Sequence, residues 1–197
     1  MTASGEHDLV AIGASWGGLD ALRTILSHLP ATLDAAVVVA QHRAPESHPT
    51  AFRDLLGAVT RMQVREAGDK DAIRRGTVYL AAPDYHLLVD PESLSLSTDA
   101  PVVFSRPSID VLLESAAESF RDRCVGVVLT GANGDGAHGL ARVVELGGAA
   151  IVQDPADATR DEMPLAALKA APSARIATAA GIGPLLVELC GLARVSV

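Results

Sequence analysis

The chain has 197 residues and a net charge of −8, with 16 Lys and Arg against 24 Asp and Glu. This length is typical of a single domain, and we interpret residues 1–197 as one domain. Hydrophobic residues make up 49% of the chain and charged residues 20%, which is typical of a globular protein and argues against intrinsic disorder. So acidic a chain lacks the overall basic character of nucleic-acid-binding proteins, and we expect no nucleic-acid partner.

The sequence carries no sign of secretion or membrane insertion. Residues 1–8 include Glu6 and Asp8 and no apolar run, which is unlike a signal peptide. The longest aliphatic run, residues 35–40, is far shorter than the ~20 residues that span a bilayer. Cys124 and Cys190 stand alone in apolar segments and lack the paired spacing of metal ligands. We therefore expect a cytoplasmic protein with two buried thiols and no metal or cofactor.

The first third of the chain alternates between strand and helix patterns. Residues 9–12 are a short aliphatic run typical of a buried strand, and residues 35–40 predict a second one. Between them, residues 19–29 repeat apolar side chains at the spacing of one helix face. Residues 49–56 predict a short helix with Pro49 in its first turn.

The middle of the chain departs from this alternation. Short strand-like segments separated by Pro- and Asp-containing turns predict an inserted antiparallel hairpin; they are residues 64–67, 78–82, 86–89 and 94–96. Residues 108–120 then predict a helix with Ser108 as its N-cap.

The alternation resumes after residue 124. The predicted strands are residues 125–129, 149–152 and 176–180, and the predicted helices are residues 136–146, 165–171 and 184–192. Repeated strand–helix units predict an α/β fold with a doubly wound, mostly parallel sheet, helices on both faces and one antiparallel hairpin. Functional sites in such sheets lie at the carboxyl ends of the strands, so the residues that follow each strand are the candidates.

The first strand is followed by Gly-Ala-Ser-Trp-Gly-Gly at residues 13–18 and then by a helix. A serine in such a tight strand-to-helix turn is exposed and close to the helix N-terminus, which suits a nucleophile. The alternative is a phosphate-binding turn. A dinucleotide site would need glycine in place of Ser15 and an acidic residue after the second strand, where Gln41 and His42 stand.

His42 follows the second strand, and Asp135 lies in the glycine-rich segment 130–136 that follows the central strand. With Ser15, these residues supply a nucleophile, a base and an orienting acid. The plainer interpretations are a loop histidine and an aspartate that caps the helix after it. His138 is a second candidate base, and the other candidate acids are Asp84, Asp154 and Asp161.

Several motifs in the same order resemble the catalytic domain of the chemotaxis protein-glutamate methylesterases (CheB-type). They are residues 12–18, 39–42, 79–86, 106–112, 126–131, 135–136 and 163–164. The resemblance implies a carboxylic ester hydrolase that removes methyl groups from glutamate side chains on the cytoplasmic helices of methyl-accepting chemoreceptors. Some members also deamidate receptor glutamines.

The resemblance assigns nucleophile, base and acid to Ser15, His42 and Asp135. It implies that the backbone N–H groups of Trp16 and Ala132 form the oxyanion hole. Other residues of the matching region are candidates for lining the cleft: His86, Arg106, Asp110, Met163 and Pro164. We expect Met163 and Pro164 to form a loop over the site.

The chain departs from the family pattern at three places. Trp16 stands where a small residue or threonine is usual, and Ala132 stands where methionine is frequent, in a loop of altered order. The chain also starts only a few residues before its first strand, so we expect no receiver domain. Two alternatives follow: a triad esterase with another substrate, or a non-catalytic interaction module. A cluster of arginines is either a positive patch or a solvated face: Arg61, Arg65, Arg74 and Arg75.

Overall fold

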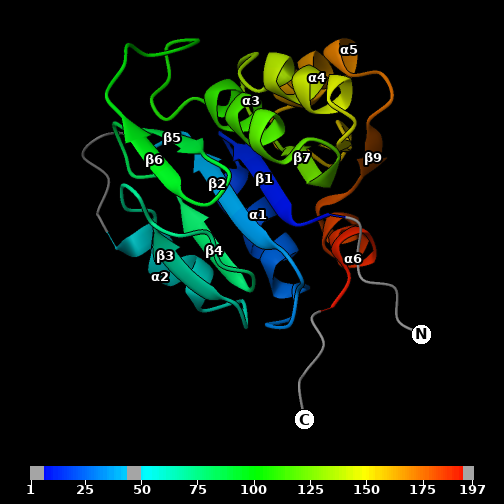
Figure 1. The fold of residues 1–197 in the computed structure, drawn as a ribbon. Coiled ribbons are helices and arrows are strands. Elements are labelled where there is room, and N and C mark those ends of the chain that lie inside the picture. Colours follow the sequence, from blue (N-terminus) through cyan, green and yellow to red (C-terminus); the bar gives the residue numbers. More distant parts are fainter. Residues whose placement is uncertain (1–6, 44–49, 193–197) are drawn as a thin grey trace.

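The computed structural model describes residues 7–43 and 50–192, and its centre is a seven-stranded parallel sheet (Figure 1). The order across the sheet is β3-β4-β2-β1-β7-β8-β9. These strands are β1 (Leu9–Ala14), β2 (Ala36–Gln41), β3 (Gln63–Glu66), β4 (Thr77–Leu80), β7 (Cys124–Val128), β8 (Ala149–Gln153) and β9 (Arg175–Ala177). A separate antiparallel hairpin joins β5 (His86–Val89) to β6 (Leu94–Ser97). The predicted fold class is confirmed.

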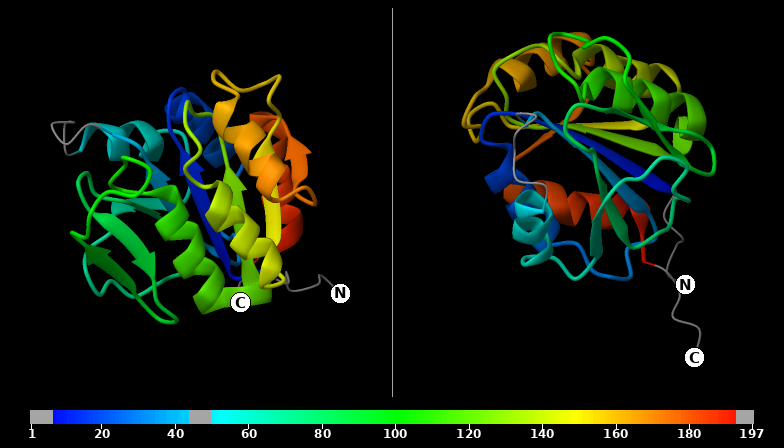
Figure 2. Two further views of the ribbon diagram at one scale, coloured as in Figure 1. Left: turned by 90° about the horizontal axis from the view of Figure 1, so that it is seen from above. Right: turned by 90° about the vertical axis from the view of Figure 1, so that its left-hand side faces the viewer.

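Helices cover both faces of the sheet, as Figure 2 shows. One face packs against α3 (Ile109–Phe120), α4 (Ala137–Glu145), α5 (Glu162–Ala170) and the hairpin. The other packs against α1 (Gly18–Ser27), α2 (Ala51–Gly57) and α6 (Ala179–Cys190). A single turn of 3-10 helix, Arg121–Arg123, leads from α3 into β7.

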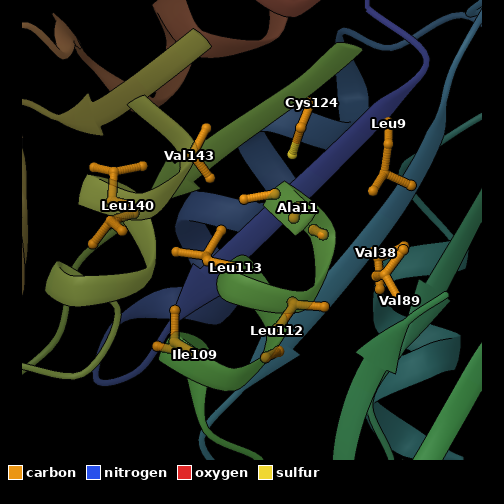
Figure 3. Packing of buried hydrophobic residues seen from close by; sticks show 14 of the residues in the cluster. Leu9, Ala11, Val38, Val89, Ile109, Leu112, Leu113, Cys124, Leu140 and Val143 are labelled. Atoms are coloured by element: carbon orange, nitrogen blue, oxygen red, sulfur yellow. The ribbon is translucent and has the colours of Figure 1, made fainter. Parts of the chain in front are cut away.

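The central strand β1 divides the interior into two hydrophobic clusters. Its residues alternate between them, because successive side chains of a strand point to opposite faces. Leu9 and Ala11 belong to the cluster under α3 and α4, while Val10 and Ile12 belong to the cluster over α1 and α6. Figure 3 shows the first cluster, in which Leu113 of α3 and Val143 of α4 meet the sheet. Every residue of β1 is buried, so the residues after it are held by a rigid element.

The chain order reverses at β1. From β1 the chain first runs to β2 on one side, and later returns to β7 on the other side. Such a switch point leaves a crevice at the carboxyl ends of the neighbouring strands. The segments that follow β1, β2 and β7 meet there, and they carry Ser15, His42 and Asp135.

The segments between residues 63 and 97 are only partly as predicted. The first two strand-like pieces, β3 and β4, pair in parallel and extend the main sheet beyond β2. Only β5 and β6 form the antiparallel hairpin. Pro49, the predicted first residue of the second helix, lies outside the described residues, and α2 begins at Ala51.

Two helices begin earlier than predicted. The helix predicted for residues 165–171 was expected to follow a loop containing Met163 and Pro164, and the helix predicted for residues 184–192 was expected to begin at Pro184. The α5 helix begins at Glu162 and contains Pro164 in its first turn, where backbone N–H groups have no partner within the helix. The α6 helix begins at Ala179, after Thr178 whose hydroxyl accepts a hydrogen bond from the N–H of Gly181. Pro184 therefore lies inside α6, and β9 ends at Ala177.

The two cysteines are buried and unpaired, as expected. Burial raises the pKa of Cys124 and of Cys190 to about 12, so neither thiol is a ready nucleophile at neutral pH. Among the described helices, none combines the length and the apolar character needed to cross a bilayer.

Candidate active site

Ser15 lies in the turn between β1 and α1. Its N–H donates to the carbonyl of Thr130, 3.0 Å away, which ties the turn to the segment after β7. Its carbonyl accepts from the N–H of Gly18 at 2.9 Å and closes the turn. Gly17, between them, has a φ of 80°, a conformation that favours glycine. The sequence around Ser15 therefore fixes a sharp bend at the end of a buried strand.

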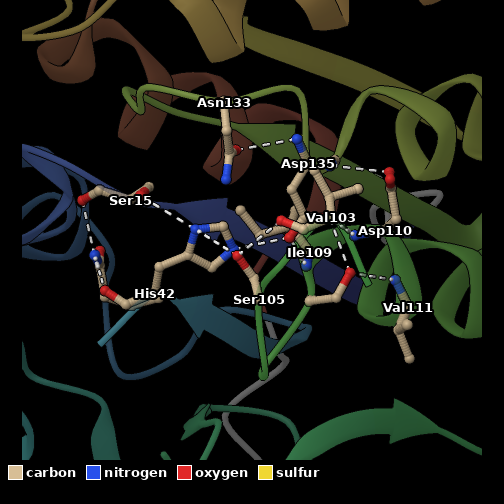
Figure 4. Close-up of polar contacts among 12 residues, drawn as sticks. Ser15, His42, Val103, Ser105, Ile109, Asp110, Val111, Asn133 and Asp135 are labelled. Carbon is tan, nitrogen blue, oxygen red and sulfur yellow. Dashed lines mark hydrogen bonds and ion pairs between the residues drawn. The ribbon is translucent and has the colours of Figure 1, made fainter. Parts of the chain in front are cut away.

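His42 joins Ser15 to Asp135. The His42 N–H donates to the carbonyl of Ala14 at 3.0 Å, so the pairing of β2 with β1 continues to this residue. Its Nδ1 lies 3.1 Å from Ser15 Oγ, and its Nε2 lies 2.8 Å from Asp135 Oδ2 (Figure 4). An ionised carboxylate only accepts hydrogen bonds, so Nε2 carries the proton and the Nδ1 lone pair faces the hydroxyl. This arrangement can take a proton from Ser15.

Asp135 does not cap the helix after it. Its carboxylate, 1% exposed, instead lies at the N-terminus of α3. The backbone N–H of Ile109 donates to Oδ2 at 2.7 Å, and that of Asp110 donates to Oδ1 at 2.9 Å. The hydroxyl of Ser108, the N-cap of α3, adds a third bond at 2.8 Å. The local interpretation of Asp135 as the cap of α4 is therefore wrong.

These bonds decide the charge of Asp135. Burial raises the pKa of its carboxyl, but the hydrogen bonds from His42 and from the N–H groups of Asp110 and Ile109 outweigh burial. The resulting pKa lies below its ordinary value. The positive end of the α3 dipole acts in the same direction. Asp135 is thus ionised at neutral pH, as a carboxylate that orients an imidazole must be.

Asp110 lies beside this carboxylate but faces another helix. It is buried, and its Oδ1 accepts from the N–H groups of Gly136 at 2.9 Å and Gly139 at 2.8 Å, at the N-terminus of α4. Burial raises the pKa of its carboxyl, and the charge of Asp135 adds to the rise. The structure thus gives Asp110 a capping position.

His86 is 1% exposed and also supports the site from behind. Its Nδ1 accepts from the N–H of Ser108 at 3.2 Å, and its Nε2 lies 3.1 Å from the carbonyl of Ala100. It makes no hydrogen bond to Ser15 or His42 within the described chain. Arg106 forms an ion pair with Asp84 at 2.6 Å. Asp84, one of the other candidate acids, therefore already has a charged partner.

Met163 and Pro164 are buried residues of the first turn of α5, so the predicted loop over the site is wrong. Met163 lies beneath Gly131, whose carbonyl accepts from the Met163 N–H at 2.9 Å. A Cβ on Gly131 would stand 1.8 Å from Met163 Sδ and 2.8 Å from Ser15 Cβ. Gly131 is therefore a spacer that only glycine can provide between α5 and the serine.

The backbone N–H groups of Trp16 and Ala132 are the predicted oxyanion hole. Neither donates to an acceptor among residues 7–43 and 50–192. The peptide that carries the Trp16 N–H is held in place, because its carbonyl, that of Ser15, accepts from the N–H of Gly18 at 2.9 Å and from Gln41 Nε2 at 2.7 Å. The indole is 64% exposed, with the guanidinium of Arg160 5.8 Å from its ring centroid. Free, fixed N–H groups beside a nucleophile are what an oxyanion hole requires.

Gln41 was not among the residues predicted to belong to the site. This buried residue is the last of β2, and its Nε2 donates to the carbonyl of Ser15 at 2.7 Å and to that of His42 at 3.1 Å. It thus bridges the backbones that carry the nucleophile and the base. Its Oε1 is a buried acceptor without a partner in the described chain. A polar residue at the end of an otherwise aliphatic strand, directly before His42, was the available signal.

The described residues hold no cluster of three or more His, Cys, Asp or Glu side chains suited to a metal ion. Asp135 is the one carboxylate bonded to His42 in the described part of the chain. The exposed His138 lies on α4 and makes no hydrogen bond to Ser15 there. A serine hydroxyl, an imidazole and an ionised carboxylate thus lie in one hydrogen-bonded series.

The model of one protein family, CheB methylesterase, matches residues 10–186. The chain belongs to the CheB methylesterase family. Membership confirms the resemblance described above and the predicted enzyme class, a carboxylic ester hydrolase.

The relatives agree with this assignment. A protein of Leptospira interrogans is 41% identical over 185 residues. These residues cover 93% of this chain and 95% of the Leptospira protein. A protein-glutamate methylesterase/protein-glutamine glutaminase of Xanthomonas campestris is 37% identical over 94% of this chain, which spans only 52% of that relative. The crystal structure of the Thermotoga maritima CheB methylesterase catalytic domain superposes with a TM-score of 0.89 at 29% identity, over 93% of this chain and 98% of that one.

Proposed function

We propose that this protein is a protein-glutamate methylesterase whose catalytic residues are Ser15, His42 and Asp135. The observation that carries the proposal is the unbroken series from Ser15 Oγ to His42 Nδ1, at 3.1 Å, and from His42 Nε2 to Asp135 Oδ2, at 2.8 Å. A serine hydroxyl is a weak nucleophile until a base takes its proton, and the base needs an acid to fix its tautomer. The names of the relatives supply the substrate class, glutamate methyl esters on proteins.

The reaction begins with attack of Ser15 Oγ on the ester carbonyl, while its proton passes to His42 Nδ1. The negative charge on the carbonyl oxygen is stabilised by the N–H groups of Trp16 and Ala132, each donor being worth roughly 10²–10³ in rate. The bond to the methoxy oxygen then breaks, and the proton on His42 leaves with methanol. Asp135 remains ionised throughout and balances the charge of the transient imidazolium.

The second half of the reaction repeats these steps with water. His42 takes a proton from a water molecule as the water oxygen attacks the carbonyl of the glutamyl-Ser15 ester. The bond to Ser15 Oγ breaks, and the hydroxyl recovers its proton from His42. The products are a glutamate carboxylate and free Ser15. A glutamine side chain would follow the same route with ammonia as the leaving group, so deamidation is a second reaction of the same site.

The proposed partners are the cytoplasmic helices of methyl-accepting chemoreceptors, and a cytoplasmic location follows from this substrate. Two of the four arginines in the predicted cluster form ion pairs within the described chain. Arg65 pairs with Asp71 at 2.9 Å, and Arg75 pairs with Asp8 at 2.7 Å and also with Asp34. The charges of Arg65 and Arg75 are therefore already compensated, which favours a solvated face over a positive patch at these two positions.

Methanol release from enzymatically methylated chemoreceptor tests the proposal, with the Ser15→Ala variant as the control. We expect release that disappears in the variant. A fluorophosphonate probe separates the alternatives. No release with Ser15 still labelled would indicate a triad esterase for another substrate, and no release with no labelling would indicate a non-catalytic interaction module.

A further inference from the structure

The segment between β6 and α3 contains a tight turn at Val102 to Ser105. The N–H of Val102 donates to the carbonyl of Ser105 at 3.1 Å, and the N–H of Ser105 donates to the carbonyl of Val102 at 2.9 Å. The two central residues, Val103 and Phe104, have φ angles of 47° and 60°. Two-residue turns of this kind strongly favour Asn-Gly, because bulky side chains are strained at positive φ. We call residues 102–105 the apolar turn.

The apolar turn exposes the side chains that cause this strain. Phe104 is 102% exposed, so it makes almost no contact within its own chain, and Val102 and Val103 are exposed too. The loop that carries them projects at the upper left of Figure 1, beyond β6. A run of exposed apolar residues is unfavourable for a folded chain on its own and usually marks a contact surface. Backbone strain of this kind tends to persist at ligand-binding elements.

The apolar turn is connected directly to the candidate base. Ser105 Oγ lies 3.5 Å from His42 Nδ1, on the atom that also faces Ser15 (Figure 4). A pocket of about 400 Å³ opens here, and its lining includes His42, Arg43, Phe104 and Ser105. A substrate that fills this pocket touches both the base and the phenyl ring.

Two further features lie near the reacting groups, one directly after Ser15 in the sequence and one in the lining of the pocket. Trp16, the residue after Ser15, is a second exposed aromatic side chain beside the reacting groups. Arg43, directly after His42, forms no ion pair with a described residue; it donates to the carbonyl of Ala81 at 2.8 Å and stacks on Phe52 at 4.6 Å. A methyl ester is too small to reach both aromatic rings and Arg43. A polypeptide with apolar and acidic side chains can do so.

We propose that the apolar turn is a specificity-determining element, in which Phe104 contacts apolar side chains next to the esterified glutamate and Arg43 faces acidic ones. The occupant is therefore an acidic, amphipathic segment of the substrate protein. This inference rests on the proposed function and adds to it the part of the chain that recognises the polypeptide around the ester.

The test compares two rates in the Phe104→Ser variant. Because loss of an aromatic contact with a bound partner weakens binding by roughly tenfold, we expect a roughly tenfold lower kcat/KM for methylated chemoreceptor, mainly through KM. The rate of fluorophosphonate labelling at Ser15 should be unchanged, since the probe is too small to need Phe104. Phe104→Leu should recover most of the receptor activity.

The matched control is Leu192→Ser. Leu192 is half exposed and follows α6 at the opposite end of the sheet, where the N–H of Asp34 donates to Gly191. It should leave both rates unchanged. Equal receptor activity in wild type and Phe104→Ser overturns the inference, and so does an equal fall in receptor activity and labelling. A wild-type protein that is labelled but does not demethylate receptor contradicts the proposed function instead, so the two failures are distinct.

Discussion

Asp110 and Asp135 cap each other's helices. Asp110 belongs to the first turn of α3 and accepts hydrogen bonds from the N-terminus of α4, while Asp135 precedes α4 and accepts hydrogen bonds from the N-terminus of α3. These hydrogen bonds join the N-termini of α3 and α4, and they hold the Asp135 carboxylate within hydrogen-bonding distance of His42. This arrangement also buries two like charges side by side, and each is compensated by N–H groups of a helix end.

The first prediction concerns Asp135→Asn. The amide has one acceptor oxygen, so the position of Oδ2 would be taken by an NH₂ group facing His42 Nε2 and the Ile109 N–H. His42 would then protonate Nδ1 and lose the lone pair that faces Ser15. We expect kcat for methanol release to fall by roughly 10³–10⁴, as for other triads with the wrong tautomer. Folding should be checked by thermal melting, because the cap of α3 is weakened as well. Retention of more than a tenth of the wild-type rate would contradict the assignment of Asp135 as the acid.

The second prediction concerns Asp110→Asn and pH. Burial raises the pKa of Asp110 above its ordinary value of 3.8, so below the folded pKa the folded state binds more protons than the unfolded state. The contribution of this carboxyl to the free energy of unfolding therefore rises as the pH falls toward 3.8. The amide does not titrate, and its oxygen can keep both bonds to α4.

The free energy of unfolding of Asp110→Asn should exceed that of wild type by the largest amount at pH values above the folded pKa of Asp110. This excess should shrink as the pH falls. Urea unfolding at about pH 7 and about pH 4 measures it. Fluorophosphonate labelling should stay close to the wild-type rate, because Asp135 still faces His42. A stability difference that grows as the pH falls would contradict the prediction.

How much the sequence could predict depends on how local the interaction is. Ser15 and His42 each follow an aliphatic run, and both runs become neighbouring parallel strands. Their meeting therefore follows from strand periodicity and the topology of doubly wound sheets. Asp135 is different. Its position in the sequence suggests a cap for α4, but the helix N-terminus that it reaches begins 26 residues earlier. Which of two adjacent helix ends a carboxylate faces depends on tertiary packing, and local spacing does not encode it.

Local sequence patterns also failed to predict the apolar turn and the position of Pro164. Residues 102–105 contain neither glycine nor asparagine, so no turn signal was present in the sequence. Pro164 was predicted to lie in a loop before a helix that begins at Leu165, yet the first turn of a helix tolerates proline and α5 begins at Glu162. Local propensity therefore predicted that α5 is a helix but not where it begins. It gave no sign of the strained turn at residues 102–105.

The third prediction concerns the spacer glycine. Gly131→Ala places a methyl group 1.8 Å from Met163 Sδ and 2.8 Å from Ser15 Cβ, so either α5 or the serine must move. We expect at least a hundredfold lower rate of methanol release, because a shift of about 1 Å at a nucleophile has such an effect. Gly134→Ala is the control in the same loop. A Cβ there meets nothing within 4 Å, so activity and melting temperature should not change. Equal behaviour of the two variants would contradict the spacer role.

The fourth prediction concerns Gln41, whose amide bridges the carbonyls of Ser15 and His42. Gln41→Leu removes both bonds and leaves two buried carbonyls without this donor, which should lower the free energy of unfolding by about 1–3 kcal/mol. Because nucleophile and base are then less firmly held, kcat should fall roughly ten- to hundredfold with little change in KM.

The chain offers a matched control for Gln41 at the end of another strand. Gln153 is the last residue of β8 and is also buried, and its amide joins the N–H of Thr130 to Asp157. Gln153→Leu should destabilise the protein by a similar amount. It should lower kcat far less, since Gln153 bonds to neither Ser15 nor His42. Urea unfolding and steady-state methanol release on both variants separate the two roles. If the two substitutions reduce kcat equally, Gln41 stabilises the fold without positioning the reacting groups.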